Sequence, residues 1–337
     1  AAAAVGCLTG SLAGAIRRIA RGRRHRSRHT ASRAAAAVTG ALLAAPSRQL
    51  QFAARCARGG AEVAADPSSL VLCFDFDGVI GDSVDESSEA AWRHAKERWP
   101  ELDLGSSAEP FLAPMRKVRP VVETGWENTV LIRILAESGT EDSLINSILS
   151  SWEEMRNMRV QEWGLDPREM IREYGEVRDR WIAADQVGWL GRNRAYDGVT
   201  DVMQAMLRGG AEVFVITTKQ KRFCAALLKD FGLQFPEEKL FALEDGPKTE
   251  VLLGLLQRPA LKGRTFHFIE DKLGTLKKVS ALPDLSEIKL HLVDWGYNTE
   301  GDRSSVRSGS LGDISLITKV DFQLLGLGRS WLDLNVA

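Results

Sequence analysis

Short, continuous apolar segments recur along the chain, with helical patterns between them. The first, residues 70–76, is suited to a strand that is buried on both faces of a sheet. Similar segments follow at 211–218, 239–243, 264–271, 288–296 and 313–317. Strands that alternate with helices indicate βαβ units and a parallel sheet. The chain is therefore expected to have an α/β core.

A long helical stretch separates the first predicted strand from the others. Residues 84–195 show helical patterns and no clear strand, and the three prolines of "AEPFLAPMRKVRP" (108–120) are interpreted as a break between helices. An insertion of this length is expected to form its own domain. We therefore expect residues 67–83 and 196–337 to form the α/β core and residues 84–195 to form a helical domain.

The first 61 residues differ in composition from the rest of the chain. They are rich in Ala and contain eleven Arg but no Asp, Glu or Lys. This composition is typical of an organelle transit peptide. Residues 1–66 are thus expected to be a leader, directing the protein to a plastid (the chloroplast) or, as a second choice, to a mitochondrion. Two alternatives stay open: a basic arm that binds nucleic acid, and a signal peptide with its apolar core at 34–45.

The charge and hydropathy of the chain from Glu62 onward restrict the kinds of partner that it can have. All 45 acidic residues lie from Glu62 onward, together with 33 of the 44 basic ones. An acidic body of this kind argues against nucleic acid as its partner. No run of residues approaches the ~20 consecutive apolar residues of a transmembrane helix, so no membrane span is expected. The oligomeric state is left open.

Polar side chains follow four of the predicted strands, at the point where each strand ends. In an open α/β sheet, ligands bind at the carboxyl ends of the strands, near the point where the strand order reverses. We therefore expect these side chains to meet in one pocket. In chain order they are Asp75, Asp77, Thr217, Thr218, Lys219, Lys248, Glu270 and Asp271.

This set of side chains is suited to phosphoryl transfer. Clustered carboxylates repel each other unless a cation neutralises them, and Mg²⁺ prefers carboxylates, water and phosphate oxygens. One carboxylate can attack phosphorus to form an aspartyl-phosphate. A second carboxyl, two residues further on, can protonate the leaving oxygen and later deprotonate water. A hydroxyl and an ammonium group can hold the phosphoryl oxygens.

The same segments resemble the four motifs of the haloacid dehalogenase (HAD) superfamily, over residues 70–295. The phosphatases of that superfamily carry DxDG(T/V) as motif I, and "DFDGVIGDS" is similar to it. The other three motifs are similar to "FVITTK", "GPKTEVL" and "FHFIEDKLGTL". The segments "RPVVETGWEN" and "DWGYNT" look closest to plant and cyanobacterial HAD-like hydrolases of unassigned substrate. The resemblance implies a Rossmann-like core with an inserted α-helical C1-type cap.

The resemblance also implies roles for four of these side chains. Asp75 would be the nucleophile and a Mg²⁺ ligand. Asp77 would be the general acid and base, with its backbone carbonyl on the metal. Thr217 would hydrogen-bond the phosphoryl group, and Lys248 would bridge Asp75 and the phosphate. An Asp at the position of Asp77 favours phosphoester chemistry, because the dehalogenases of the superfamily lack it.

Five further residues are expected at the site. Asp271, together with Glu270, would complete the metal site. Thr218 and Lys219 would contact the phosphate. Arg119, in the inserted domain, would meet a substrate anion, although an ion pair within that domain is an equally open interpretation.

The sequence thus predicts a Mg²⁺-dependent phosphatase that hydrolyses a small phosphorylated metabolite. Two alternatives stay open. One is a phosphomutase on the same fold, which would return the phosphoryl group to a sugar. The other is a non-catalytic binding or assembly protein built on the same scaffold.

Overall fold

The computed structural model describes residues 66–325. The leader predicted at residues 1–66 lies, apart from its last residue, outside the described residues. The predictions of a transit peptide and of a plastid location rest on that segment. None of the helices in the described part has the length and hydropathy needed to cross a membrane.

Six parallel strands form one sheet, in the order β5-β4-β1-β6-β7-β8. Their bounds are β1 Leu70–Phe74, β4 Glu212–Ile216, β5 Leu240–Phe241, β6 Thr265–Glu270, β7 Lys289–Val293 and β8 Ile314–Ile317. In the sheet, β4 and β5 lie on one side of β1, and β6, β7 and β8 lie on the other side. The predicted α/β, Rossmann-like fold is confirmed.

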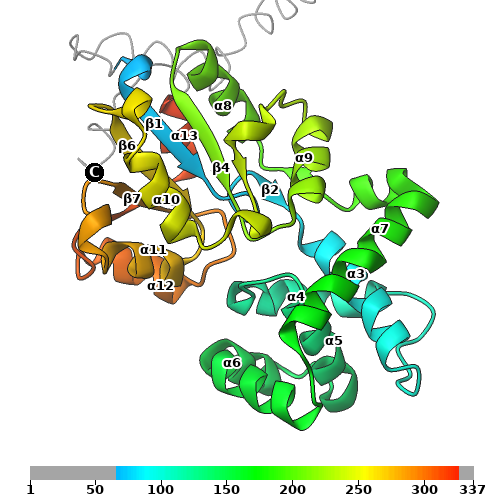
Figure 1. The fold of residues 1–337 in the computed structure, drawn as a ribbon. Helices are drawn as coiled ribbons and strands as arrows, with labels where there is room; N and C mark the ends of the chain where they lie inside the picture. Colours follow the sequence, from blue (N-terminus) through cyan, green and yellow to red (C-terminus); the bar gives the residue numbers. More distant parts are fainter. Residues whose placement is uncertain (1–65, 326–337) are drawn as a thin grey trace, which may run out of the picture. The chain divides into compact units, whose positions relative to one another are not determined.

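Helices cover both faces of the sheet, which explains why β1 is apolar along its whole length. Leu70, Leu72 and Phe74 pack on one side, against α8, α9 and α13. Val71 and Cys73 pack on the other side, against α10, α11 and α12. The bounds are α8 Val199–Arg208, α9 Lys221–Asp230, α10 Lys248–Leu256, α11 Leu273–Ser280, α12 Glu300–Arg307 and α13 Lys319–Leu325 (Figure 1).

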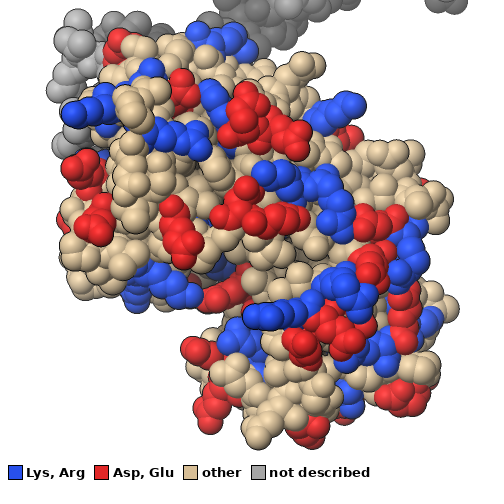
Figure 2. Space-filling model, in the orientation of Figure 1, with Lys and Arg blue, Asp and Glu red and all other residues tan. Residues whose placement is uncertain are grey.

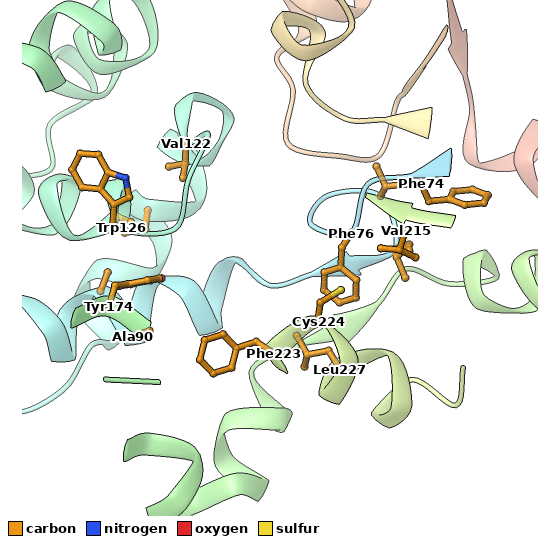
Figure 3. Close-up of a cluster of buried hydrophobic side chains, with 14 of the residues drawn as sticks. Phe74, Phe76, Ala90, Val122, Trp126, Tyr174, Val215, Phe223, Cys224 and Leu227 are labelled. Atoms are coloured by element: carbon orange, nitrogen blue, oxygen red, sulfur yellow. The ribbon is translucent and has the colours of Figure 1, made fainter. Parts of the chain in front are cut away.

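The core continues past the end of β1 into the turn that carries the acidic residues. Phe76 is fully buried and lies beside Cys224 and Leu227 of α9 (Figure 3). Its ring stacks on Phe231 at 6.0 Å between ring centroids. The apolar side chain between Asp75 and Asp77 therefore anchors the turn in the core, while the two carboxyl groups point elsewhere.

Five α-helices and one short 3-10 helix (Arg119–Val121) follow in residues 84–191, and we call this segment the cap. The α-helices are α3 Val84–Arg98, α4 Glu109–Val118, α5 Glu127–Ser138, α6 Asp142–Glu162 and α7 Pro167–Gly191. A two-stranded antiparallel ribbon of β2 (Gly81–Asp82) and β3 (Arg194–Ala195) joins the cap to the sheet-bearing part of the chain. Acidic and basic side chains are interspersed over the face of the molecule shown in Figure 2.

Two expectations about the inserted stretch were wrong. The short strand β3 lies within residues 84–195, where no strand was expected. The proline-rich segment forms helix α4 instead of a break. Pro110 lies in the first turn of α4, where a missing N–H costs nothing. Pro114 lies further inside, and burial of Met115 and Val118 stabilises the helix despite it.

A buried ion pair ties two cap helices together. Glu86 of α3 is fully buried, and the guanidinium of Arg178 on α7 donates to both of its carboxylate oxygens at 2.7 and 2.8 Å. The indole of Trp189 donates a third hydrogen bond to Glu86 at 2.9 Å. All the charge on this carboxylate is thus compensated inside the protein.

Replacing Glu86 with Ala is expected to lower the free energy of unfolding by about 3–5 kcal/mol, because it leaves Arg178 buried without a counter-ion. Chemical denaturation of the purified variant measures the effect. The matched control is Glu176→Ala, which removes an exposed ion pair with Arg172 on α7 and is expected to change nothing measurable. Equal stability of Glu86→Ala and wild type would contradict the expectation.

Candidate active site

Two strand ends and the start of a helix bring an amine and two carboxylates together. Asp75 follows β1, and its N–H donates to the carbonyl of Ile269 on β6 at 2.9 Å. Glu270 is the last residue of β6, and Lys248 is the first residue of α10. Lys248 Nζ lies 2.8 Å from Asp75 Oδ1 and 2.7 Å from Glu270 Oε2. The predicted convergence of these strand ends is present because β1 and β6 are neighbours in the sheet.

Asp271 adds a third carboxylate to the cluster. Asp75, Glu270 and Asp271 each offer an oxygen, and these oxygens lie within 4.8 Å of one another. The N–H of Tyr297 donates to Asp271 Oδ2 at 2.8 Å, which orients this carboxylate. Gly78 makes the close approach possible: its φ is +86°, and a Cβ there would overlap the Asp271 carboxylate.

The cluster fits a hard divalent cation such as Mg²⁺. Asp271 Oδ1 is buried and has no hydrogen-bond partner among the described residues. Asp75 Oδ1 is also buried, and the Lys248 ammonium lies 2.8 Å from it. Buried carboxylate oxygens without donors are costly unless a cation meets them. Oxygen atoms of this kind are the ligands that Mg²⁺ prefers.

Burial is the largest cause of the pKa shifts of these three carboxyl groups. It raises the pKa of Asp75 to about 7 and the pKa of Glu270 to about 7, although Lys248 acts in the opposite direction on both. Burial also raises the pKa of Asp271. A cation that binds here must therefore displace protons as the pH falls below about 7.

Asp77 has different partners from Asp75. Its Oδ1 accepts a hydrogen bond from the Ser83 hydroxyl and lies 3.1 Å from Lys219 Nζ. Burial alone would raise the pKa of Asp77, but Lys219, Arg119 and the Ser83 hydroxyl together outweigh it and lower that pKa. Asp77 is therefore ionised at neutral pH when no substrate is present.

A cavity of about 220 Å³, called the main cavity below, opens beside these groups. It is lined by core residues from the strand ends and by cap residues of the segment 119–124. Of the residues predicted for the site, those that line it are Asp75, Asp77, Arg119, Thr218, Lys248, Glu270 and Asp271.

Two residues predicted to contact phosphate lie elsewhere. The hydroxyl of Thr217 accepts the N–H of Lys219 at 3.1 Å, and Thr217 is not among the residues lining the main cavity. The Lys219 ammonium is buried against Asp77 and lies 3.8 Å from Glu86 of the cap. The roles of both residues in phosphate binding stay predictions.

Sequence reasoning missed two residues that hold neighbouring segments at the site: Lys272 holds the cap segment 119–124, and Tyr297 holds residues 82–83 just before the cap. Lys272 Nζ donates to the carbonyls of Arg119 and Pro120 at 3.1 and 2.5 Å. The Tyr297 hydroxyl donates to Asp82 Oδ1 at 2.7 Å and accepts the N–H of Ser83 at 2.8 Å. Both residues lie inside quoted motifs, directly after predicted strands. Their position directly after predicted strands was the signal in the sequence that could have identified them.

Comparison with known proteins gives neighbours among solved structures. A haloacid dehalogenase-like hydrolase from Bacteroides fragilis is 16% identical, with a TM-score of 0.45, covering 75% of this chain and 98% of its own. A structure described as a predicted phosphoglycolate phosphatase from Haemophilus somnus is 12% identical, with a TM-score of 0.48, covering 77% and 97%. One assigned as a β-phosphoglucomutase from Bacteroides vulgatus is 16% identical, with a TM-score of 0.44, covering 75% and 86%.

No family model matches the chain, and no curated protein matches it. The neighbouring structures include hydrolases and phosphatases of the superfamily that the motifs resemble. At these identities and TM-scores they transfer neither a reaction nor a substrate to this chain. The functional proposal below therefore rests on the geometry of the site.

Proposed function

We propose that this protein is a Mg²⁺-dependent phosphatase that hydrolyses a small phosphomonoester. One observation carries the proposal: Asp75 and Asp77 line the same cavity, with Lys248 bridging Asp75 and Glu270 at 2.8 and 2.7 Å. A buried nucleophile, a separate proton carrier and a fixed cation are the groups that phosphoryl transfer to an aspartate requires.

In the first step, an oxygen of the Asp75 carboxylate forms a bond to phosphorus while the bond from phosphorus to the ester oxygen breaks. Asp77 gives its proton to the departing oxygen. In the second step, Asp77 takes a proton from water, whose oxygen bonds to phosphorus as the bond to Asp75 breaks. Lys248 holds the Asp75 carboxylate in place and offsets negative charge through both steps.

Asp77 has to take up the proton that it donates in the first step. Asp77 is ionised beside Lys219 in the free protein. A phosphoryl dianion entering the main cavity adds negative charge nearby, which raises the pKa of Asp77 and favours uptake of a proton. Asp75, Glu270 and Asp271 would hold the Mg²⁺ ion, which when bound supplies positive charge beside the phosphoryl oxygens.

The proposal is tested by incubating the full chain and Mg²⁺ with a panel of phosphorylated metabolites and measuring inorganic phosphate. A cavity of about 220 Å³ leads us to expect activity on small esters and little on nucleotides. Conversion of a sugar phosphate into its isomer without phosphate release would point to a phosphomutase instead. A folded protein that hydrolyses no ester would contradict enzymatic function.

Removal of divalent cations with EDTA is expected to abolish phosphate release, and added Mg²⁺ is expected to restore it. Because burial raises the pKa of Asp75 and Glu270 to about 7, protons compete with the cation at lower pH. The Mg²⁺ concentration for half-maximal activity should therefore rise as the pH is lowered from about 8 to about 6. K⁺ at equal ionic strength is the control. Full activity after EDTA treatment would refute the metal requirement.

A further inference from the structure

The loop that follows β7, residues 294–298, contacts several parts of the site, although the proposed reaction gives it no role. We call it the β7 loop. Because β7 is the neighbour of β6 in the sheet, this loop lies beside the strand end that carries the acidic cluster. Asn298 Nδ2 donates to the carbonyl of Asp271 at 3.0 Å, and the indole of Trp295 donates to the carbonyl of Val79 at 3.1 Å. The loop is thus fixed to the segments that follow both β6 and β1.

Tyr297 is the residue of the β7 loop that reaches furthest across the site, and it is only 8% exposed. Its backbone N–H donates to Asp271 Oδ2 at 2.8 Å. Its hydroxyl, at the other end of the side chain, donates to Asp82 Oδ1 at 2.7 Å and accepts the N–H of Ser83 at 2.8 Å. One residue therefore contacts both the acidic cluster and the segment that leads into the cap.

The partners of the Tyr297 hydroxyl fix its direction. An ionised carboxylate such as Asp82 can only accept a hydrogen bond, and the backbone N–H of Ser83 can only donate one. The second oxygen of Asp82, Oδ2, lies 3.0 Å from Arg116 of the cap, which holds this carboxylate from its other side. The hydroxyl proton is therefore directed at Asp82, and the hydroxyl oxygen is left to hold the backbone of Ser83.

Ser83 connects this contact to Asp77. The residue is only 1% exposed, and its hydroxyl donates to Asp77 Oδ1. Lys219 Nζ lies 3.1 Å from the same oxygen, so the Ser83 hydroxyl supplies a second, directed contact that orients the carboxylate. Because Tyr297 holds Asp271 through its backbone and Ser83 through its hydroxyl, it fixes the position of Asp77 relative to the acidic cluster.

Close packing leaves the Tyr297 ring little room to move. A Cβ at Gly78 would lie 2.9 Å from Tyr297 Cδ2, and a Cβ at Gly296 would lie 2.5 Å from the carbonyl oxygen of Gly78. A side chain at either position would therefore push the β7 loop away from the turn after β1. The Arg119 guanidinium also lies 4.1 Å from the centroid of the ring. The ring is thus held in place before any substrate binds, as a positioning role requires.

We propose that Tyr297 is a positioning residue for phosphoryl transfer: its hydroxyl holds Ser83, and through Ser83 it directs the Asp77 carboxyl at the leaving oxygen. This inference rests on the proposed phosphatase function. Asp77 has to reach the leaving oxygen in the first step and water in the second, and a misplacement of about 1 Å can cost about 100-fold in rate. Attack of Asp75 on phosphorus does not involve this hydroxyl. Loss of the hydroxyl should therefore slow the two proton transfers and leave the attack on phosphorus nearly unchanged.

Tyr297→Phe tests the inference, because it removes the hydroxyl and keeps both the ring and the backbone N–H that donates to Asp271. The substrate, with Mg²⁺ present, is the alkyl monoester that the wild type cleaves fastest. We expect kcat to fall by about 10–100-fold and KM to stay within about threefold of wild type. The Mg²⁺ concentration for half-maximal activity should stay within about twofold, since the contact with Asp271 is kept.

A double-mutant cycle with Ser83→Ala tests whether Tyr297 acts through Ser83. If it does, the double variant should lose no more kcat than Ser83→Ala alone. The matched control is Tyr174→Phe, which removes another buried hydroxyl, one that donates to the carbonyl of Ser87 within the cap at 2.9 Å. Tyr174 does not line the main cavity, and this variant should keep kcat within about threefold of wild type.

Acetyl phosphate separates the two chemical steps. Its leaving group is acetate, which departs without taking a proton, so Asp77 is needed only when water attacks the phosphorylated Asp75. With ³²P-labelled acetyl phosphate, the rate at which Tyr297→Phe is labelled should stay within about threefold of wild type. Labelled protein should accumulate above the wild-type level, because its hydrolysis is slowed. Labelling also shows that the variant is folded.

Three outcomes would overturn the inference and leave the proposed function standing. The first is an unchanged kcat for the alkyl ester in Tyr297→Phe. The second is an equal loss in alkyl ester turnover and in labelling by acetyl phosphate, which would indicate a general distortion of the site. The third is a double variant whose loss is the product of the two single losses, which would make the effect of Tyr297 independent of Ser83. A wild-type protein that hydrolyses no ester would remove the proposed function and this inference with it.

Discussion

Asp75→Asn is expected to reduce phosphate release by about 10⁴-fold or more, because an amide cannot act as the nucleophile that accepts the phosphoryl group. The variant should still fold. Asn has nearly the shape of Asp, and Lys248 keeps Glu270 as a counter-ion at 2.7 Å. Thermal unfolding of the Mg²⁺-free variant is therefore expected to stay close to that of wild type.

Two measurements check this expectation. Steady-state phosphate release gives the loss of rate. Acid quenching of a reaction with a ³²P-labelled ester tests whether label is attached to the protein. We expect label on the wild-type protein and none on Asp75→Asn. The control is Asp284→Asn, which changes an exposed aspartate on the core surface. Retention of activity by Asp75→Asn on every ester that the wild type cleaves would refute the assignment of the nucleophile.

Lys248→Met is expected to affect both activity and stability. The ammonium lies between two buried carboxylates, and its removal takes away the fixed cation beside the phosphoryl group. We expect kcat/KM to fall by about 10²–10³-fold. Without Mg²⁺, the uncompensated carboxylates should also lower the free energy of unfolding by about 3–5 kcal/mol at neutral pH.

The stability loss in Lys248→Met should depend on pH. Burial already raises the pKa of Asp75 and Glu270 above their values in the unfolded chain, and loss of the lysine raises both further. The folded variant then binds more protons than the unfolded chain, so its stability falls as the pH rises through the range from about 5 to 8. Urea denaturation at several pH values measures this slope.

Mg²⁺ should restore part of the stability of Lys248→Met, since it binds the same carboxylates in the folded state. The control is Lys262→Met, which changes an exposed lysine in the loop before β6. A stability of Lys248→Met that equals wild type and does not vary with pH would contradict the ion-pair geometry. Unchanged turnover would contradict the role of Lys248 at the site.

Local patterns in the sequence were sufficient for the sheet and for the acidic cluster. Strand β1 is a continuous apolar run, β6 is mostly apolar, and polar side chains begin where each of them ends, at Asp75 and at Glu270. Neighbouring parallel strands end at the same edge of the sheet, so the side chains that directly follow them lie close together. The convergence of Asp75 and Asp271 therefore followed from the strand pattern, whereas Lys248 reaches them from the first residue of α10.

Only the tertiary structure decided which partner each polar side chain meets. Lys219 contacts Asp77 and approaches Glu86, and Lys272 holds the carbonyl of Arg119, a residue 153 positions away in the chain. Helix α4 likewise forms through the proline-rich segment because its apolar side chains are buried against the other cap helices. These contacts depend on how the cap packs on the strand ends, which no local pattern encodes.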